Sequence, residues 1–474
     1  MKKFLVSCAY IYPLCPLSIN HAKMFVVADV IARNERKKGN NVFFPIASHY
    51  SGNSAQKISE IFSGTFSKDG EIDNKNEQKL LYLYRDVYKT PVSILKTFIN
   101  PLNILEFYNQ EILWELKSLG ISCDYENFYT TGHKDFPAFV KTIISFYEKN
   151  NLLIKNADED LALDYNNKTW KREAIGLINN TEFIQPFHKN NIISATKDVR
   201  NDWGLLRKSG FGVNYKGEWI VDPMFDSEIF TIFDLYIKFK NEHKPITAEK
   251  FFTELLKVLD GRHKSKNALT NKIANFLPCD VLICEEHLKN WVVKKFYAES
   301  LLLDKKYQTK KYFILGMGFI DGKQMSASKG HAILAKDLIS VYGPTKARLI
   351  ILLVGGHPSK MYNYDKNLPI QADKLLNNFI SHYMHLISIL GKNTVKIRGA
   401  KDLSISLAST SIEDNIERGY YRQAVIELLS ILPKKYYESP SVRMANNLIS
   451  VYNKYLEILL PGLISNFGNY EKIH

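Results

Sequence analysis

The hydrophobic and polar positions at the start of the chain predict three elements in succession. Residues 4–9 form a short apolar run that ends in turn-prone residues. Residues 21–37 have the spacing of an amphipathic helix, and Asn40 and Asn41 separate it from a second apolar run at 42–46. Strand, helix and strand in this order predict a βαβ unit, which requires a parallel sheet.

The pattern further along the chain predicts that this sheet is interrupted and then resumed. Residues 75–190 are mixed but largely helical in pattern, with loops rich in Lys and Asn at 149–180. Strand-like runs return at 218–221, Asp280–Cys284 and 312–320. From residue 334 onward the periodicity is mostly helical, with polar breaks at 391–399 and 433–440, and it predicts a small helical bundle.

The composition adds one feature to this picture, a large positive charge. A chain of 474 residues is too long for one ordinary core, so we expect two or three domains. The formal net charge is +14. Because Lys and Arg displace counterions from phosphates, this surplus favours a polyanionic partner such as tRNA. The alternative is a basic composition with no nucleic acid bound.

The cysteines and the apolar runs argue against several classes of protein. The five cysteines contain no Cys-x-x-Cys pair, so neither a zinc knuckle nor another metal site is expected. Their odd number and irregular spacing favour reduced thiols in a cytoplasmic protein. Only four apolar or small residues separate Lys3 from Cys8, whereas a secretory segment needs about 7–15. No apolar run reaches the ~18 residues of a membrane span, so no membrane partner is expected.

The first predicted turn between strand and helix carries a recognisable motif. Ser18, Ile19, Asn20 and His21 begin the helix, where free N–H groups and the positive end of the helix dipole favour a phosphate. At this place the class I aminoacyl-tRNA synthetases have His-Ile-Gly-His. With the flanks that follow, residues 3–55 resemble the archaeal type of leucyl-tRNA synthetase, and methionyl-tRNA synthetase is the second resemblance.

Further elements of the same family follow in the expected order. They correspond to the segment before the connective insertion, the point where the insertion rejoins the core, the strand lining the amino-acid pocket and the Lys-Met-Ser-Lys-Ser loop. In this chain they are residues 119–124 with 129–131, the element from Arg200 through Asp202 and Trp203 to Arg207, residues 219–227, and residues 321–330.

The resemblance implies an α/β fold with two domains. It implies a Rossmann-type parallel-sheet catalytic domain at residues 1–355, split by a reduced connective insertion at about 105–195. An α-helical, anticodon-binding-like bundle would occupy residues 356–474. Residues 153–190 leave too little chain for the editing domain of the leucine, isoleucine and valine enzymes. The chain is therefore interpreted as a truncated, divergent paralogue, and as a monomer.

The resemblance also implies a set of site residues, with ATP and Mg²⁺ as cofactors. His21 and Lys329 would be catalytic. The residues implied to bind ATP are Ser18, Ile19, His21, His287, Lys323, Met325, Ser326, Ser328 and Lys329. Those implied to bind the amino acid are Tyr10, Tyr12, His49 and Asp226, where Asp226 would hold the substrate ammonium. The alternative roles are helix capping, core packing and a polar surface loop.

This chain departs from the family pattern at the ATP site. Ser18 replaces the first His of His-Ile-Gly-His, and Asn20 replaces its Gly, which would crowd an adenine ring. Gln324 and Ala327 replace the two signature lysines of the later loop. Glu285 replaces a glycine of the element that holds the ribose, and a carboxylate near phosphates is unfavourable.

Three functions therefore remain open from the sequence. The first is an ATP-dependent ligase that activates leucine or a similar amino acid as an aminoacyl-adenylate and transfers it to tRNA. The second is a paralogue that transfers the activated amino acid to a non-tRNA acceptor in a biosynthetic pathway. The third is a non-catalytic pseudo-synthetase.

Overall fold

The computed structural model describes residues 2–67, 75–155, 161–199, 203–217, 219–240, 247–261, 268–392 and 403–464. Arg200 and Asp202 of the rejoining element, and Glu218 of the expected strand at 218–221, lie outside these ranges. Within them, no helix combines the length and the apolar character needed to cross a membrane.

A five-stranded sheet forms the centre of the molecule. Its order is β2-β1-β11-β12-β7, and each neighbouring pair is parallel. The strands are β1 (Lys3–Cys8), β2 (Asn41–Phe43), β7 (Glu182–Phe183), β11 (Asp280–Cys284) and β12 (Lys311–Leu315). The predicted βαβ unit and the α/β, Rossmann-like class are thereby confirmed. Strand β11, which pairs with β1 in the sheet, follows in the chain only after a long insertion.

Two of the predicted strands are wrong in their placement. Residues 219–221 form β10 (Trp219–Val221), which pairs antiparallel with β8 (Leu206–Arg207) and β9 (Asn214–Tyr215) outside the main sheet. Both edges of β10 are already paired, with β8 and β9, so no edge remains for the main sheet. The run at 312–320 divides into β12 and β13 (Gly318–Ile320), which pairs with β14 (Lys323–Gln324) and β15 (Tyr362–Asn363).

Helix α1 (Ile19–Lys37) packs along the sheet and orients the first motif. Its N-cap is Ser18, whose hydroxyl accepts the His21 backbone N–H at 3.4 Å. The Ile19 N–H donates to the Ile333 carbonyl at 2.8 Å, which fixes the start of the helix against the segment before α13 (Ala335–Tyr342). The sequence therefore places the N-terminus of α1 at the carboxyl ends of the strands.

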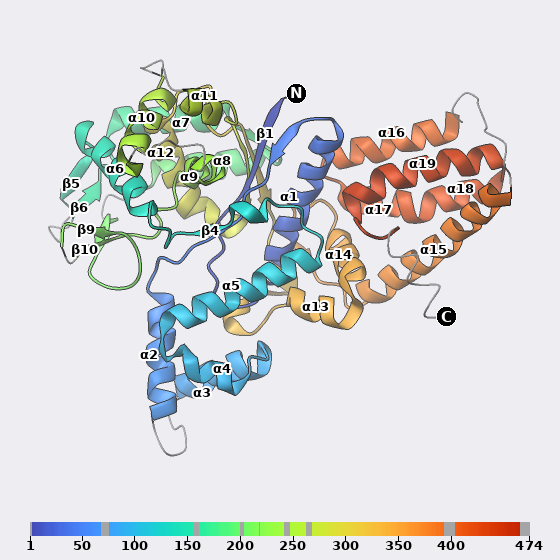
Figure 1. Ribbon diagram of the computed structural model, residues 1–474, viewed down its shortest axis with the longest axis horizontal. Helices are drawn as coiled ribbons and strands as arrows, with labels where there is room; N and C mark the ends of the chain where they lie inside the picture. Colours follow the sequence, from blue (N-terminus) through green and yellow to red (C-terminus); the bar gives the residue numbers. More distant parts are fainter. Residues whose placement is uncertain are drawn as a thin grey trace.

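The helices between β2 and β11 in the chain form two separate groups (Figure 1). One lies at the bottom of the view and comprises α2 (Ser54–Ser67), α3 (Lys75–Tyr82), α4 (Val92–Leu95) and α5 (Pro101–Ser118). The other lies at the upper left and comprises α6 (Phe136–Lys149), α7 (Lys168–Asn180), α8 (Pro186–Lys197), α9 (Phe230–Phe239), α10 (Ala248–Leu259) and α11 (Ala268–Ala274). Helix α12 (Val293–Leu302) follows β11. The short strands β3 (Ala47–Ser48) with β4 (Tyr129–Thr130), and β5 (Leu153–Lys155) with β6 (Leu161–Leu163), pair separately.

The C-terminal group forms a bundle at the right of Figure 1. After α14 (Pro344–Leu353) it contains α15 (Leu368–Lys392), α16 (Leu403–Glu417), α17 (Tyr421–Ile426), α18 (Leu432–Glu438) and α19 (Val442–Leu459). The predicted break at 433–440 begins too early, because Pro433 occupies the first turn of α18, where its missing N–H costs no hydrogen bond.

A buried charge cluster joins this bundle to the Rossmann-like fold. Arg348 of α14 is 1% exposed and donates to Asp29 of α1 at 2.6 Å. It also donates to the carbonyls of Leu119 and Leu459 at 3.0 and 2.8 Å. Burial alone would raise the pKa of Asp29, but Arg348 and Arg33 lower it, so this carboxylate is ionised. One guanidinium thus connects α1, α5, α14 and α19.

Candidate active site

A cavity of about 340 Å³ lies at the N-terminus of α1 and the carboxyl ends of β11 and β12, where ligands bind in open α/β sheets. Fourteen residues from two distant stretches of the chain line it: Cys15, Ser18, Asn20, His21, Cys284, Glu286, Gly316, Met317, Gln324, Met325, Ser326, Ala327, Ser328 and Lys329. The first motif and the later loop, which are about 300 residues apart in sequence, therefore share one cavity.

His21 is held from two sides in this cavity. Its Nδ1 lies 3.1 Å from the Ser18 hydroxyl, and its Nε2 lies 3.7 Å from the Glu286 carboxylate. Glu286 also lies 3.8 Å from Nε2 of His287. The nearby His21 side chain lowers the pKa of Glu286, so this carboxylate is ionised near neutral pH, in a cavity that Lys329 also lines.

The loop that follows β14, residues 325–331, is held by its own backbone hydrogen bonds and by Tyr88. Ser326 and His331 exchange backbone hydrogen bonds at 2.7 and 3.1 Å, and Gly330 has φ of 70°, which suits glycine. The buried Tyr88 hydroxyl donates to the Ala327 carbonyl at 2.7 Å. The hydroxyls of Ser326 and Ser328 lie 3.2 Å apart and face the cavity.

Asn20 occupies space at the opposite wall. The Tyr362 hydroxyl donates to its side-chain oxygen, and Gly318 lies so close that a β-carbon there would be 2.5 Å from that oxygen. Only glycine fits at position 318. The Asn20 side chain therefore forms part of the wall of the cavity, and the crowding of an adenine ring stays a prediction.

The structure brings together six of the residues expected to bind ATP and separates three. Those that line the cavity are Ser18, His21, Met325, Ser326, Ser328 and Lys329. Ile19 is fully buried in the core, Lys323 is exposed on β14, and His287 contacts Glu286 without lining the cavity. Glu286 rather than Glu285 lines the cavity, and sequence reasoning missed it, although it stands in the same motif.

The residues expected to bind the amino acid form a second cluster around His49. The Tyr10 and His49 rings stack at 6.0 Å, and Tyr12 meets His49 edge-on at 6.1 Å. Asp226 is buried, and both of its oxygens are engaged, by Nε2 of His49 at 2.8 Å and by the Ser51 hydroxyl at 2.6 Å. A substrate ammonium at Asp226 would share the carboxylate with these two donors.

A second buried carboxylate lies behind Tyr10, and sequence reasoning missed it. Tyr10 is hydrogen-bonded to the Tyr129 hydroxyl, and Tyr129 donates to Asp234 of α9 at 2.7 Å. Ser7 donates to the other oxygen of Asp234 at 3.1 Å. Burial raises the pKa of Asp234 to about 7. The aromatic cluster therefore ends on a carboxyl group that changes charge near neutral pH.

This raised pKa predicts a pH dependence of stability. The unfolded chain releases the proton of Asp234 near pH 4, whereas the folded chain keeps it up to about pH 7. The folded state binds the extra proton over this interval, so the free energy of unfolding falls as pH rises from 5 to 7. Burial raises the pKa of Glu115 and Glu228 to about 8, which adds to the same trend.

Urea unfolding at pH 5, 6 and 7 measures this slope. Asp234→Asn should flatten it by up to about 1.4 kcal/mol per pH unit, the contribution of one proton. Asp414→Asn, at an exposed aspartate of α16, should leave the slope unchanged. An equal slope in wild type and Asp234→Asn would show that Asp234 is ionised throughout this range.

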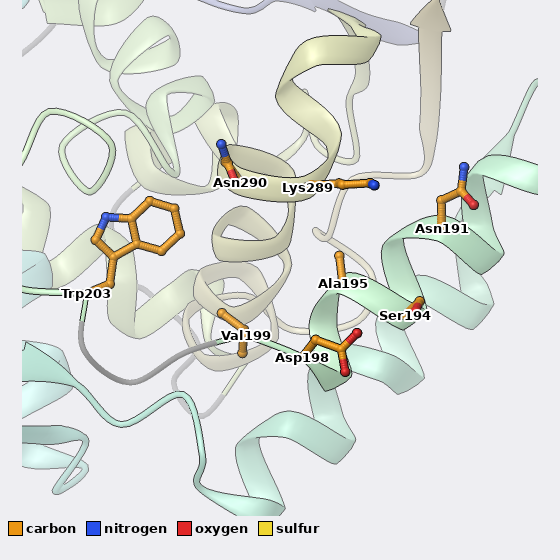
Figure 2. A pocket seen from close by; sticks show the side chains of 8 residues that line it. All are labelled: Asn191, Ser194, Ala195, Asp198, Val199, Trp203, Lys289 and Asn290. Atoms are coloured by element: carbon orange, nitrogen blue, oxygen red, sulfur yellow. The ribbon is translucent and has the colours of Figure 1, made fainter.

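A larger hollow, of about 590 Å³, lies between α8 and the segment that carries Lys289 and Asn290 (Figure 2). One wall is the face of α8 that carries Asn191, Ser194 and Asp198, and Lys289 and Asn290 face it from η6 (Leu288–Val292). Trp203 of the rejoining element closes a third side, and the Lys294 ammonium lies 3.4 Å from the centre of its ring. The charged side chains that line the hollow are Lys289 and Asp198, one of each sign.

Comparison with known sequences finds relatives over part of the chain. Leucine–tRNA ligase of Pyrococcus horikoshii is 37% identical over 143 residues, which is 30% of this chain and 13% of that protein. Leucine–tRNA ligase 2 of Sulfolobus acidocaldarius is 27% identical over 139 residues, 29% of this chain and 14% of that protein. The matched region thus spans about one seventh of these relatives. No family model matches the chain.

Comparison with solved structures covers almost the whole chain. Mycobacterium tuberculosis methionyl-tRNA synthetase in complex with methionyl-adenylate superposes with a TM-score of 0.66 and 13% identity. The superposition covers 97% of this chain and 92% of that one. The overall fold is therefore that of a class I aminoacyl-tRNA synthetase. Its sequence relatives are archaeal leucine–tRNA ligases, as the motifs predicted.

Proposed function

We propose that this chain activates an amino acid with ATP and transfers it to tRNA. The observation that carries the proposal is the shared cavity, which joins the N-terminus of α1 and His21 to Ser326, Ser328 and Lys329. A helix N-terminus, an imidazole, two hydroxyls and an ammonium suit a polyphosphate. The structural neighbour that was solved with methionyl-adenylate supports this assignment.

The proposed reaction has two steps, and residues of the cavity stabilise the charges that develop in the first. A carboxylate oxygen of the amino acid attacks the α-phosphorus of ATP, the bond to the bridging oxygen breaks, and pyrophosphate leaves. His21 and the N-terminus of α1 stabilise the charge on the α-phosphoryl group, and Lys329 stabilises that on the leaving pyrophosphate. A hydroxyl of the acceptor then attacks the acyl carbon and releases AMP. Mg²⁺ would enter with the ATP phosphates, as it usually does.

The partners follow from the relatives and from the charge. Leucine is the proposed amino acid because the relatives are named leucine–tRNA ligases. The formal net charge of +14 supports tRNA as the acceptor. In this proposal residues 1–355 are the catalytic domain, 356–474 bind tRNA as a helical domain, and Tyr10, Tyr12, His49 and Asp226 contact the amino acid.

The exchange of labelled pyrophosphate into ATP tests activation directly. Exchange should depend on one amino acid, with leucine, methionine, isoleucine and valine tested first. A full panel of amino acids without exchange would rule out activation. Charging of purified tRNA then identifies the acceptor, since exchange without charging favours the paralogue that uses a non-tRNA acceptor.

Glu286 favours a second candidate, a nucleotide-binding protein without catalysis. Its ionised carboxylate lies in the cavity, where it opposes phosphates. Glu286→Gln should tighten the binding of a non-hydrolysable ATP analogue about fivefold to tenfold, since one partly exposed charge contributes ~1 kcal/mol. Calorimetry measures this change, and Glu285→Gln, which does not line the cavity, is the matched control.

Tighter binding in Glu286→Gln without amino-acid-dependent exchange in either protein would support this second candidate. Unchanged binding would place the phosphates away from Glu286. Binding and exchange together in the wild type would support the synthetase reaction.

A further inference from the structure

Lys23 is a buried lysine that has no hydrogen-bond partner among the described residues. It lies one turn after Asn20 on α1, is 3% exposed, and its ammonium makes no hydrogen bond. Burying an unpaired ammonium is costly, so such a group usually has a partner or serves a ligand. Its Nζ lies 4.4 Å from the centre of the Tyr362 ring, which makes a cation–π contact.

Its neighbours place Lys23 directly behind the wall of the cavity. Tyr362, whose ring it contacts, donates its hydroxyl to Asn20, and Asn20 lines the cavity. The Cys284 thiol, which also lines the cavity, interacts electrostatically with Lys23. The side chains of Tyr362 and Asn20 therefore lie between the ammonium and the cavity, and a charge buried at this place is weakly screened by solvent.

The cavity has neutral residues where the resembling loop has lysines, so a positive charge behind its wall would matter for an anionic ligand. Gln324 and Ala327 are neutral at the places where the resembling loop has lysines, and Glu286 adds a negative charge. We propose that Lys23 supplies, from behind the wall, part of the positive charge that a nucleoside triphosphate requires in this cavity, and that it takes up a proton when the triphosphate binds. This inference rests on the proposed binding of ATP and assigns Lys23 as a positioning residue.

Lys23 changes its protonation state near neutral pH, where ATP binding can be measured. Burial lowers the pKa of Lys23 to about 7, so it is mostly neutral at pH 8 in the free protein. The nearby groups on other elements do not titrate there: burial raises the pKa of Cys284 to about 12 and raises that of Tyr362, whereas it lowers that of His357. A polyanion in the cavity stabilises the protonated form of Lys23 and draws in a proton.

Calorimetry of ATP binding in buffers with different ionisation enthalpies measures this proton. At pH 8 the phosphates of ATP are already ionised. If the ligand raises the pKa of Lys23 by one unit, from about 7 to 8, we expect an uptake of roughly 0.4 proton per ATP. Lys23→Met keeps the length of the side chain, removes the proton uptake and, for this shift in pKa, weakens ATP binding about twofold at pH 8. Lys374→Met, at an exposed lysine of α15, keeps both.

The outcomes separate this inference from the proposed function. Loss of proton uptake in Lys23→Met, with a melting temperature at or above that of the wild type, supports the role of Lys23, because a purely structural lysine would not change the linkage. ATP binding with no buffer dependence in the wild type, or with the same dependence in Lys23→Met, overturns it and leaves the synthetase proposal standing. Absence of ATP binding in the wild type overturns both.

Discussion

Arg348→Met should lower the free energy of unfolding by about 3–5 kcal/mol, the usual cost of removing one partner of a buried ion pair. The substitution removes one of the two guanidinium partners of the buried, ionised Asp29 carboxylate, the one at 2.6 Å, and leaves Arg33 at 2.8 Å. It also leaves the carbonyls of Leu119 and Leu459 without their donor. Urea unfolding at pH 7, followed by circular dichroism, measures the loss.

Two further variants separate the buried charge from the lost side chain. Lys366→Met breaks the ion pair between Lys366 and Asp321, whose side chains are 71% and 69% exposed. It should lower the free energy of unfolding by at most about 1 kcal/mol. Adding Asp29→Asn to Arg348→Met removes the carboxylate charge that Arg348 no longer compensates, and it should recover part of the stability. A loss below about 1 kcal/mol in Arg348→Met would mean that water or Arg33 compensates Asp29.

The elements that sequence could predict are those whose signal is local. Asp280–Cys284 is a continuous apolar run of the kind that a strand buried on both faces requires, and it forms β11 over the same residues. Strand β7 has only two residues, Glu182 and Phe183, too few for any periodicity, and it joins the sheet edge because β12 offers a free side. Length therefore determined which strands could be predicted.

The site could be predicted where it follows a motif, and not where it depends on contacts across the fold. Ser18, His21, Ser326 and Lys329 stand in two ordered motifs, and the structure gathers them in one cavity. Asp234 lies inside the apolar helix Phe230–Phe239, and its partners Tyr129 and Ser7 are 105 and 227 residues away. No local pattern marks such a carboxylate, because its role comes from tertiary contacts alone.

His21→Ala should lower the rate of amino-acid-dependent ATP–pyrophosphate exchange about 100-fold, mainly in kcat, because the imidazole acts on charge that develops in the transition state. The control, His385→Ala, removes an exposed histidine of α15 and should keep the wild-type rate.

Ser18→Ala distinguishes this chemical role from capping. The Ser18 hydroxyl accepts the His21 N–H as the N-cap of α1, so its loss should cost about 1 kcal/mol of stability. It also removes the contact at 3.1 Å that orients Nδ1, so exchange should fall by less than in His21→Ala. If His21→Ala instead keeps wild-type exchange while losing stability, His21 serves only the start of the helix, and the charge on the α-phosphoryl group must be stabilised by backbone N–H groups and the loop at Ser326–Lys329.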